Sequence, residues 1–129
     1  MLAYVALGGL LGTVARYGLQ GWLQTRAGMT IFPIGTLLIN VVGSQLLGFI
    51  VRYATGSTSI SPEVRGALTI GFCGGFTTFS TFSAEAIGLI EGGEYARATT
   101  YVLLSVALCL LATLAGMTTM KLIATTNGR

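Results

Sequence analysis

The sequence predicts an all-α membrane protein with four transmembrane helices, and three features of the chain lead to this prediction. The 129 residues are 53% hydrophobic and 9% charged, whereas soluble domains carry about 25% charged residues. Uncharged stretches recur along the chain at lengths close to the roughly 20 residues that a membrane span requires. The connections are short, so we expect the spans to run up and down as neighbours in one domain covering residues 1–129.

Each predicted helix is bounded by residues that are typical of helix ends. We expect helices at about 2–24, 32–53, 62–90 and 95–123. Pro33 suits the start of the second helix, because proline is favoured at the first helical position. Ser61-Pro62-Glu63 gives the third helix a capping hydroxyl, a proline and an acid in its first turn. Glu91-Gly92-Gly93-Glu94 then predicts the turn into the fourth helix.

Glycines spaced four residues apart occur in the first and third predicted helices. They are Gly8 and Gly12 in the first helix, and Gly71 and Gly75 in the third. Lipid gives helices no hydrophobic reason to associate, and small residues instead allow their backbones to approach closely. Close helix packing is the favoured interpretation of Gly8 and Gly12.

The distribution of basic residues leaves the orientation in the membrane open. With four spans, the N-terminus, the second connection and the C-terminus lie on one side, where the excess of basic residues is weak under the positive-inside rule. A chain that inserts both ways up would have this pattern, and so would a chain with an ordinary but weak signal. One side holds Arg52, Arg65, Lys121 and Arg129, and the other holds Arg26, Arg97 and, if its side chain reaches that way, Arg16.

Composition excludes several classes of function. The chain has no histidine, and Glu85 is the only acid away from the ends of the predicted spans, so neither a general base with its partner nor a zinc site can be built. We therefore expect no enzyme and no organic cofactor. A net charge of +3, scattered along the chain, does not indicate nucleic-acid binding. Cys73 and Cys109 both lie in apolar runs, where packing is the favoured interpretation.

The stretch Gly71–Ser83, GFCGGFTTFSTFS, is unusual for a membrane span. It combines three glycines and five hydroxyl residues with four phenylalanines. Residues 73–77 predict a break in the third helix at mid-membrane depth, where unwound backbone is tolerated only if it is buried or lines a cavity. Phe79 and Phe82 lie three residues apart and share a face. The alternative is a lipid-facing aromatic pair in a flexible helix, but the hydroxyl content favours a polar path.

Further polar residues lie at membrane depth in the second and fourth spans. Asn40 requires a partner or water there, and on its own it is slightly better explained by a hydrogen bond between helices. Thr36 lies one turn earlier on the same face. Tyr101 and Ser105 are four residues apart and form a stripe with Cys109. Most such stripes are packing seams, although the phenol suits a pore lining.

These residue types match the needs of a small anion that has lost its water. Amide, hydroxyl and backbone N–H groups donate hydrogen bonds to it without trapping it as a fixed lysine would. Aromatic ring edges carry partial positive charge and attract an anion weakly. A cation path would instead use carbonyls, acids or ring faces, and the sequence pattern alone does not decide between ring edges and ring faces.

Three motifs in this chain resemble those of the Fluc (CrcB) fluoride channels. They are Gly71–Ser83 followed by Ala84-Glu85, Gly35–Asn40 (GTLLIN) with Gly43, and Gly8-Gly9 with Gly12, Ala15 and Arg16. With four spans in 129 residues, the resemblance covers nearly the whole chain. It implies a fluoride-selective channel in the bacterial inner membrane that passively exports fluoride from the cytoplasm and so relieves fluoride toxicity.

The resemblance also implies an assembly and roles for individual residues. Family members are antiparallel, dual-topology homodimers with two fluoride pores and a central structural sodium ion, held here by the backbone carbonyls of Gly74 and Thr77. The expected partners are a second copy of the chain, fluoride and membrane lipid. By the same match, the fluoride pore is lined by Asn40, Phe79, Phe82, Ser80 and Thr81, a polar track by Thr36, Tyr101 and Ser105, and a vestibule by Arg16.

Two positions depart from the family pattern. Cys109 stands where some relatives have serine, so the polar track would lose a hydrogen-bond donor at that end. Phe76 stands where leucine is common, and we expect little effect from it.

Two other functions remain as alternatives. A small proton-coupled multidrug exporter would need an acid in its first span, and residues 1–25 contain none. A non-transporting subunit, in which the glycines and hydroxyls only pack helices, would show no ion flux.

Overall fold

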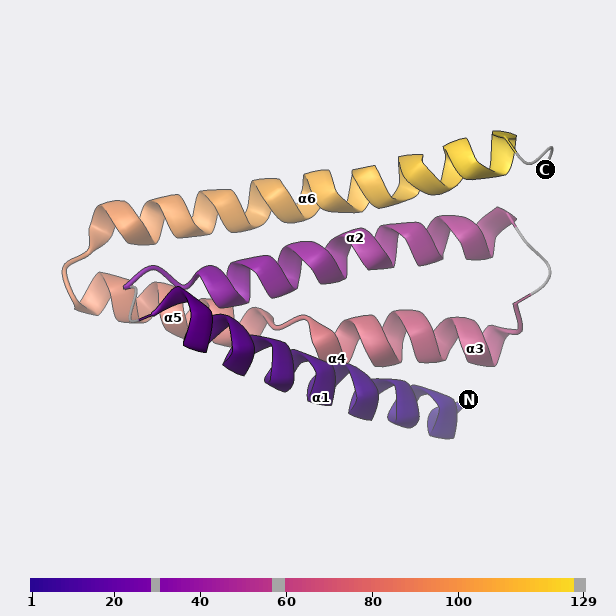
Figure 1. The fold of residues 1–129 in the computed structure, drawn as a ribbon, viewed down its shortest axis with the longest axis horizontal. Coiled ribbons are helices and arrows are strands. Elements are labelled where there is room, and N and C mark those ends of the chain that lie inside the picture. The colour runs from indigo at the N-terminus through magenta and orange to yellow at the C-terminus, as the bar shows by residue number, and fades with distance from the viewer. Residues whose placement is uncertain (29–30, 57–59, 127–129) are drawn as a thin grey trace.

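The computed structural model describes residues 1–28, 31–56 and 60–126, and every regular element within these ranges is helical. The prediction of an all-α protein is confirmed. Figure 1 shows an elongated bundle in which α2 and α6 run side by side, while the segments of the third span follow one another beside α2. The elements are α1 (Leu2–Ala27), α2 (Ile34–Gly56), α3 (Pro62–Gly66), the π-helical segment η1 (Ala67–Cys73), α4 (Gly74–Phe76), α5 (Phe79–Glu91) and α6 (Tyr95–Thr126).

Three helices are long and apolar enough to cross a membrane. The candidate spans are Leu2–Leu23, Ile34–Thr55 and Tyr95–Thr126. The predicted third span at 62–90 is instead divided among α3, η1, α4 and α5, each of which is too short to be a span by itself. Laid end to end, these four segments extend along the bundle beside α2 (Figure 1).

The third span departs twice from regular α-helical geometry. Its segment η1 is π-helical over seven residues, and such turns are rare and often found at functional sites. Thr77 and Thr78, between α4 and α5, have extended backbone, with φ and ψ of −82° and 159° at Thr77 and −149° and 109° at Thr78. Gly74 and Gly75, which the sequence places within the expected break, are helical in α4.

Glycines bring α2 and α6 into backbone contact. Gly48 of α2 faces the carbonyl oxygen of Thr113 on α6, and Gly116 of α6 faces the carbonyl oxygen of Gln45 on α2. A Cβ atom at either glycine would overlap the backbone opposite it. The helices therefore approach until their backbones touch, and the resulting van der Waals contact takes the place of the hydrophobic drive that lipid does not supply.

The same kind of contact joins α1 to the third span. A Cβ atom at Gly8 would overlap the carbonyl oxygen of Ala67, and one at Gly12 would overlap that of Phe72. In the other direction, a Cβ atom at Gly75 would lie 2.6 Å from a backbone oxygen of α1. Helix packing is thus the role that the structure gives Gly8 and Gly12, in agreement with the sequence interpretation.

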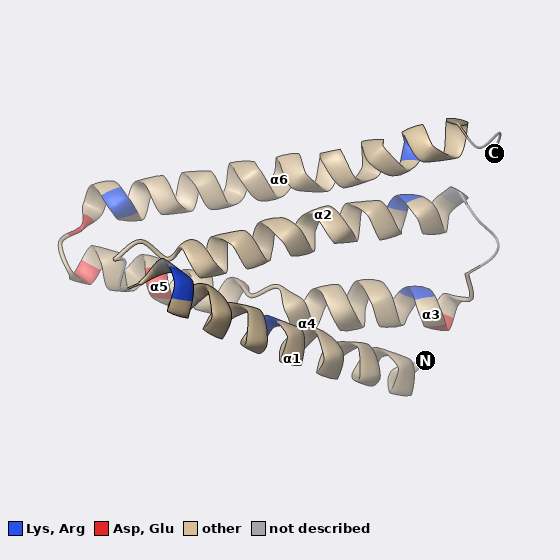
Figure 2. Cartoon of the chain, viewed as in Figure 1, with Lys and Arg blue, Asp and Glu red and all other residues tan. Residues whose placement is uncertain are grey.

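Charged residues gather toward the two ends of the bundle (Figure 2). Glu94 and Arg97 form an ion pair of 2.8 Å at the start of α6. The middle of the helices is formed by neutral residues, with Arg16 and Glu85 as exceptions. This distribution suits a bundle that meets water at both ends and lipid around its middle. Arg129, one of the residues counted for orientation, lies outside the described residues.

We expect the substitution Gly116→Ala to lower the free energy of unfolding by about 1–3 kcal/mol, because overpacking at a backbone contact forces the helices apart. The midpoint of thermal unfolding in detergent, followed by the fluorescence of the single tryptophan Trp22, measures this effect. Gly88→Ala is the matched control, since a Cβ atom at Gly88 meets nothing within 4 Å. An unchanged or raised midpoint for Gly116→Ala would contradict the close contact between α2 and α6.

Candidate functional site

The candidate site is built around the interruption of the third span, where the side chain of Asn40 pairs with unwound backbone. The N–H of Thr78 donates to Asn40 Oδ1 at 2.7 Å, and Asn40 Nδ2 donates to the carbonyl oxygen of Thr78 at 3.1 Å. An amide side chain offers an acceptor and a donor side by side, so Asn40 satisfies both the backbone N–H and the backbone carbonyl of Thr78. The interpretation of Asn40 as a hydrogen bond between helices is confirmed, and its Nδ2 keeps a second hydrogen.

The hydroxyl of Thr78 caps the helix that follows. Thr78 Oγ1 accepts from the N–H of Thr81 at 3.2 Å and donates to Thr81 Oγ1 at 2.9 Å. Ser80 Oγ lies 3.3 Å from the same hydroxyl. A threonine at this position compensates one of the N–H groups that the first turn of a helix leaves without a partner. The predicted pore hydroxyls Ser80 and Thr81 therefore belong to one hydrogen-bonded cluster at the N-terminus of α5.

The backbone carbonyls before the interruption lose their usual helical partners. In a continuous helix, the N–H of Thr78 would bond to the Gly74 oxygen and the N–H of Thr81 to the Thr77 oxygen. These two N–H groups donate instead to Asn40 Oδ1 and Thr78 Oγ1. The residue Gly74 is exposed in the single chain. Two carbonyl oxygens are thereby freed close to the interruption.

Arg16, expected at a vestibule, contacts this same region. Its Nε donates to the carbonyl oxygen of Gly75 at 3.1 Å, and the side chain is half-buried. The bond links α1 to α4 and places a guanidinium group one residue from Gly74. The positive charge of Arg16 lies close to the freed carbonyl oxygens and makes the electrostatic potential around them less negative.

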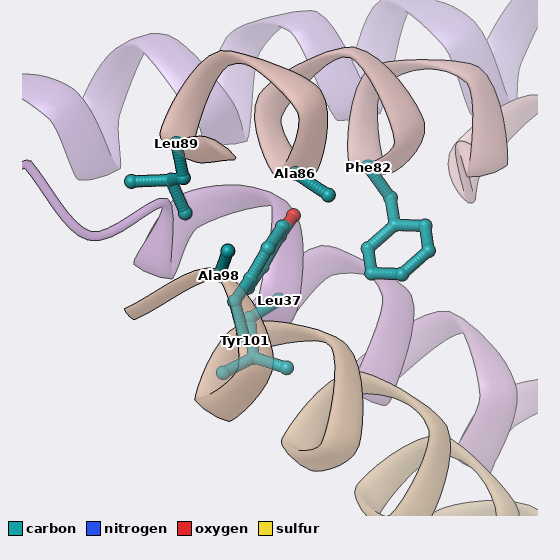
Figure 3. Packing of buried hydrophobic residues seen from close by; sticks show 6 residues of the cluster. All are labelled: Leu37, Phe82, Ala86, Leu89, Ala98 and Tyr101. Carbon is teal, nitrogen blue, oxygen red and sulfur yellow. The ribbon is translucent and has the colours of Figure 1, made fainter. Parts of the chain in front are cut away.

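The predicted pore phenylalanines lie on α5 at different depths. Phe82 is buried and Phe79 is 77% exposed in the single chain, with 5.2 Å between their ring centroids. Figure 3 shows Phe82, Ala86 and Leu89 directed toward Tyr101 of α6. The Phe82 and Tyr101 rings are tilted by 50°, again with 5.2 Å between centroids. A continuous aromatic surface thus leads from the exposed side of α5 to the centre of the bundle.

The polar track residues converge on a carboxylate. Thr36 Oγ1 donates to Glu85 Oε1 at 2.8 Å, and the Tyr101 hydroxyl donates to Glu85 Oε2 at 2.7 Å. Both donors are almost completely buried. Ser105, one turn beyond Tyr101, is also buried, and its hydroxyl finds no partner within the described part of the chain. Cys109 continues the stripe and is half-buried.

Two residues of the site were not assigned a role from the sequence. Thr78 could have been found from its position, because a hydroxyl residue before a new helical segment is the usual N-terminal cap. Glu85 could have been found because a lone acid in an apolar span indicates a functional site by default. Their partners Asn40, Thr36 and Tyr101 come from other helices, and sequence spacing does not reveal such pairs.

The residues around the interruption limit the ways in which a metal could be held. Within residues 1–28, 31–56 and 60–126, no group of three His, Cys, Asp or Glu side chains could hold a metal ion. A cation at this place would therefore need backbone or hydroxyl oxygens. Hard cations such as calcium and magnesium accept carbonyl oxygens as ligands, and the freed oxygens of Gly74 and Thr77 are of this type.

Comparisons with known proteins agree with the sequence resemblance. The family model described as "CrcB-like protein, Camphor Resistance (CrcB)" matches residues 3–117. A protein from Geobacter sulfurreducens named fluoride-specific ion channel FluC is 52% identical over 113 residues, which is 88% of this chain and 90% of the relative. Proteins of the same name are 49% identical in Geobacter metallireducens, over 91% of this chain and 94% of the relative, and 45% identical in Hahella chejuensis, over 95% of both. The chain therefore belongs to the CrcB (Fluc) family.

Proposed function

We propose that this protein is a fluoride-selective channel that passively exports fluoride from the cytoplasm. The observation that carries the proposal is the identity of about half of the aligned residues, over some nine-tenths of the chain, to relatives named fluoride-specific ion channels. The site adds chemical support, because it gathers amide, hydroxyl and aromatic groups around a helix interruption.

The donors at the site suit a small anion that must pass without being trapped. The second Nδ2 hydrogen of Asn40 and the hydroxyls of Ser80 and Thr81 lie near the N-terminus of α5, where the helix dipole favours negative charge. Phe79 and Phe82 add ring edges that attract an anion weakly. Binding of this strength allows release as well as entry, which conduction requires.

An antiparallel homodimer with two pores accounts for the exposed side of the site. Phe79 is 77% exposed in the single chain, and Gly74 and Ser80 are also exposed. In the proposed assembly, a second copy inserted the opposite way up covers this surface and contributes its own phenylalanines to each path. The contact is isologous, because the same surface is used by both chains. The weak asymmetry of basic residues is compatible with insertion in both orientations.

A structural sodium ion fits the freed carbonyls. The oxygens of Gly74 and Thr77 have lost their helical donors to Asn40 and Thr78, and a two-fold axis near them would present equivalent oxygens from both chains. A bound cation there supplies positive charge that holds the two interruptions together and offsets anions nearby. We propose that the ion stays in place during transport.

Passive export from a bacterial cytoplasm needs no energy-coupling site. Hydrogen fluoride is a weak acid that crosses membranes in its neutral form and ionises inside. An inside-negative potential then drives the anion outward with about 2.3 kcal/mol per 100 mV. The first span contains no acid that could couple export to protons, which argues against the exporter alternative. We place the channel in the bacterial inner membrane.

We expect purified protein in liposomes to release loaded fluoride rapidly and loaded chloride very slowly. Ion-selective electrodes measure both after the membrane potential is collapsed with a potassium ionophore. Liposomes without protein are the control. Equal release of both ions, or release of neither, would contradict the proposed function and favour a less selective pore or a non-transporting subunit, respectively.

We expect Asn40→Asp and Phe82→Ile to reduce fluoride efflux by about tenfold or more, which corresponds to about 1.4 kcal/mol in the barrier. A carboxylate at position 40 faces the Thr78 carbonyl without a proton to donate and repels an anion. Isoleucine at position 82 removes the ring between Phe79 and Tyr101. Leu103→Ile, at an exposed position of α6, is the control. If both variants assemble and still release fluoride at the wild-type rate, neither Asn40 nor Phe82 lines the pore.

We expect sodium to stabilise the assembled protein against heat. Thermal unfolding is measured in buffers that contain sodium or the large organic cation N-methyl-D-glucamine, at equal ionic strength. A ligand present at about 100 times its dissociation constant adds about 2.7 kcal/mol to the native state, so the midpoint rises by several degrees. Potassium is the control for a general salt effect. Equal midpoints in sodium and in the organic cation would exclude a structural sodium ion.

A further inference from the structure

The Glu85 carboxyl group lies inside the polar track and accepts from two of its hydroxyls. It accepts two short hydrogen bonds, from Thr36 of α2 at 2.8 Å and from Tyr101 of α6 at 2.7 Å. Hydrogen bonds from hydroxyls to an ionised carboxylate are short and strong. Three elements of the bundle are thereby joined through one side chain.

These bonds decide which atoms of Thr36 and Tyr101 face an anion that passes along the track. A hydroxyl has one hydrogen to donate, and the hydrogens of Thr36 and Tyr101 are both directed at Glu85. Toward any other group, the two oxygens present lone pairs, which repel an anion. The hydroxyl of Ser105 is the next donor along the stripe and is buried without a partner among the described residues. The track therefore contains donors, but its first two are occupied.

Glu85 forms no salt bridge with a basic side chain among residues 1–28, 31–56 and 60–126, where the ion pair is that between Arg97 and Glu94. The half-buried Arg16 instead donates to the Gly75 carbonyl, ten residues before Glu85 in the chain. Glu85 lies one turn beyond Phe82, at the point where the aromatic surface reaches Tyr101. On the proposed path, Glu85 follows the two phenylalanines.

We propose that Glu85 is a displaceable internal competitor that regulates anion passage through the polar track. When the carboxylate holds Thr36 and Tyr101, it takes the place of the permeant anion on their hydroxyls. When the carboxylate moves away, both hydroxyls are free to donate to the passing ion. This inference rests on the proposed function, because it specifies how the same path is opened and closed.

If Glu85 only supported the fold, the neutral variant Glu85→Gln would lower fluoride efflux. A competing carboxylate predicts the opposite, a rise in efflux. Glutamine has nearly the same shape, a weaker acceptor and two added donors. We expect initial fluoride efflux from liposomes to rise about threefold or more, since a fixed negative charge on the path is removed. The fluoride concentration that gives half of the maximal rate should fall as well. Glu91→Gln makes the same chemical change at an exposed position at the end of α5 and is the matched control.

A double-mutant cycle with Tyr101→Phe tests the competition itself. In the wild-type background the Tyr101 hydroxyl is committed to Glu85, so its loss should change flux little. In the Glu85→Gln background the hydroxyl faces a neutral and weaker acceptor and can turn to the anion, so its loss should reduce flux several-fold. Contacting residues give such non-additive effects when they act on the same step. Equal effects of Tyr101→Phe in both backgrounds would overturn the inference.

The remaining outcomes separate this inference from the proposed function. Wild-type liposomes that release no more fluoride than chloride would overturn the proposed function and this inference with it. Fluoride-selective release by the wild type, with Glu85→Gln at or below the wild-type rate, would overturn the inference alone. If Glu85→Gln fails to assemble, Glu85→Asp carries the test, because its shorter side chain cannot hold both hydroxyls. A rate at or below that of the wild type for Glu85→Asp would then overturn the inference.

Discussion

The pairing between Asn40 and Thr78 is the interaction on which the rest of the site depends. A backbone amide without a partner costs several kcal/mol in hydrocarbon, which is why interruptions in membrane helices are rare. Here one side chain from α2 satisfies both the backbone N–H and the backbone carbonyl of Thr78, at 2.7 and 3.1 Å. The interruption can therefore persist where water is scarce. Because the amide is fixed to a long helix, the position of the interruption is fixed too.

The glycine contacts give that pairing and the Glu85 cluster their common frame. Gly48 and Gly116 hold α2 and α6 at backbone distance, so Thr36 and Tyr101 can reach the two oxygens of one carboxylate. In water, burial of apolar side chains would bring the helices together, but lipid removes that drive. The same bundle would loosen if the glycines gained side chains, and the polar groups between its helices would lose their geometry first.

Local sequence patterns identified the elements well and the partners poorly. The composition and the uncharged stretches were enough to predict an all-α protein, and the tract Gly71–Ser83 contains the residues at which the third span is interrupted. The extended residues are nevertheless Thr77 and Thr78, whereas Gly74 and Gly75 stay helical. Glycine weakens a helix, but α1 packs directly on Gly75 and keeps that segment regular. A break also needs partners for its freed groups, and Asn40 and the threonine hydroxyl supply them three residues later.

The hydrogen-bond partners of Glu85 could not be predicted from sequence spacing for a related reason. Its partners Thr36 and Tyr101 lie 49 and 16 residues away along the chain. A stripe of polar residues on one helix shows that a polar face exists, but the group that the face binds is set by the packing of three segments. The polar character of these residues was therefore predictable from the sequence, but the bonding of the Thr36 and Tyr101 hydroxyls to Glu85 was not.

One interruption creates two surfaces of opposite character. Where α4 ends, carbonyl oxygens project with negative potential, and where α5 begins, N–H groups and the Thr78 hydroxyl cluster carry positive potential. A single unwound dipeptide thus offers ligands for a cation on one side and donors for an anion on the other, with the Arg16 guanidinium as the basic group described beside it. Because both surfaces arise from the same two extended residues, neither can be altered without moving the other. A chain with few charges can in this way place groups of opposite polarity a short distance apart.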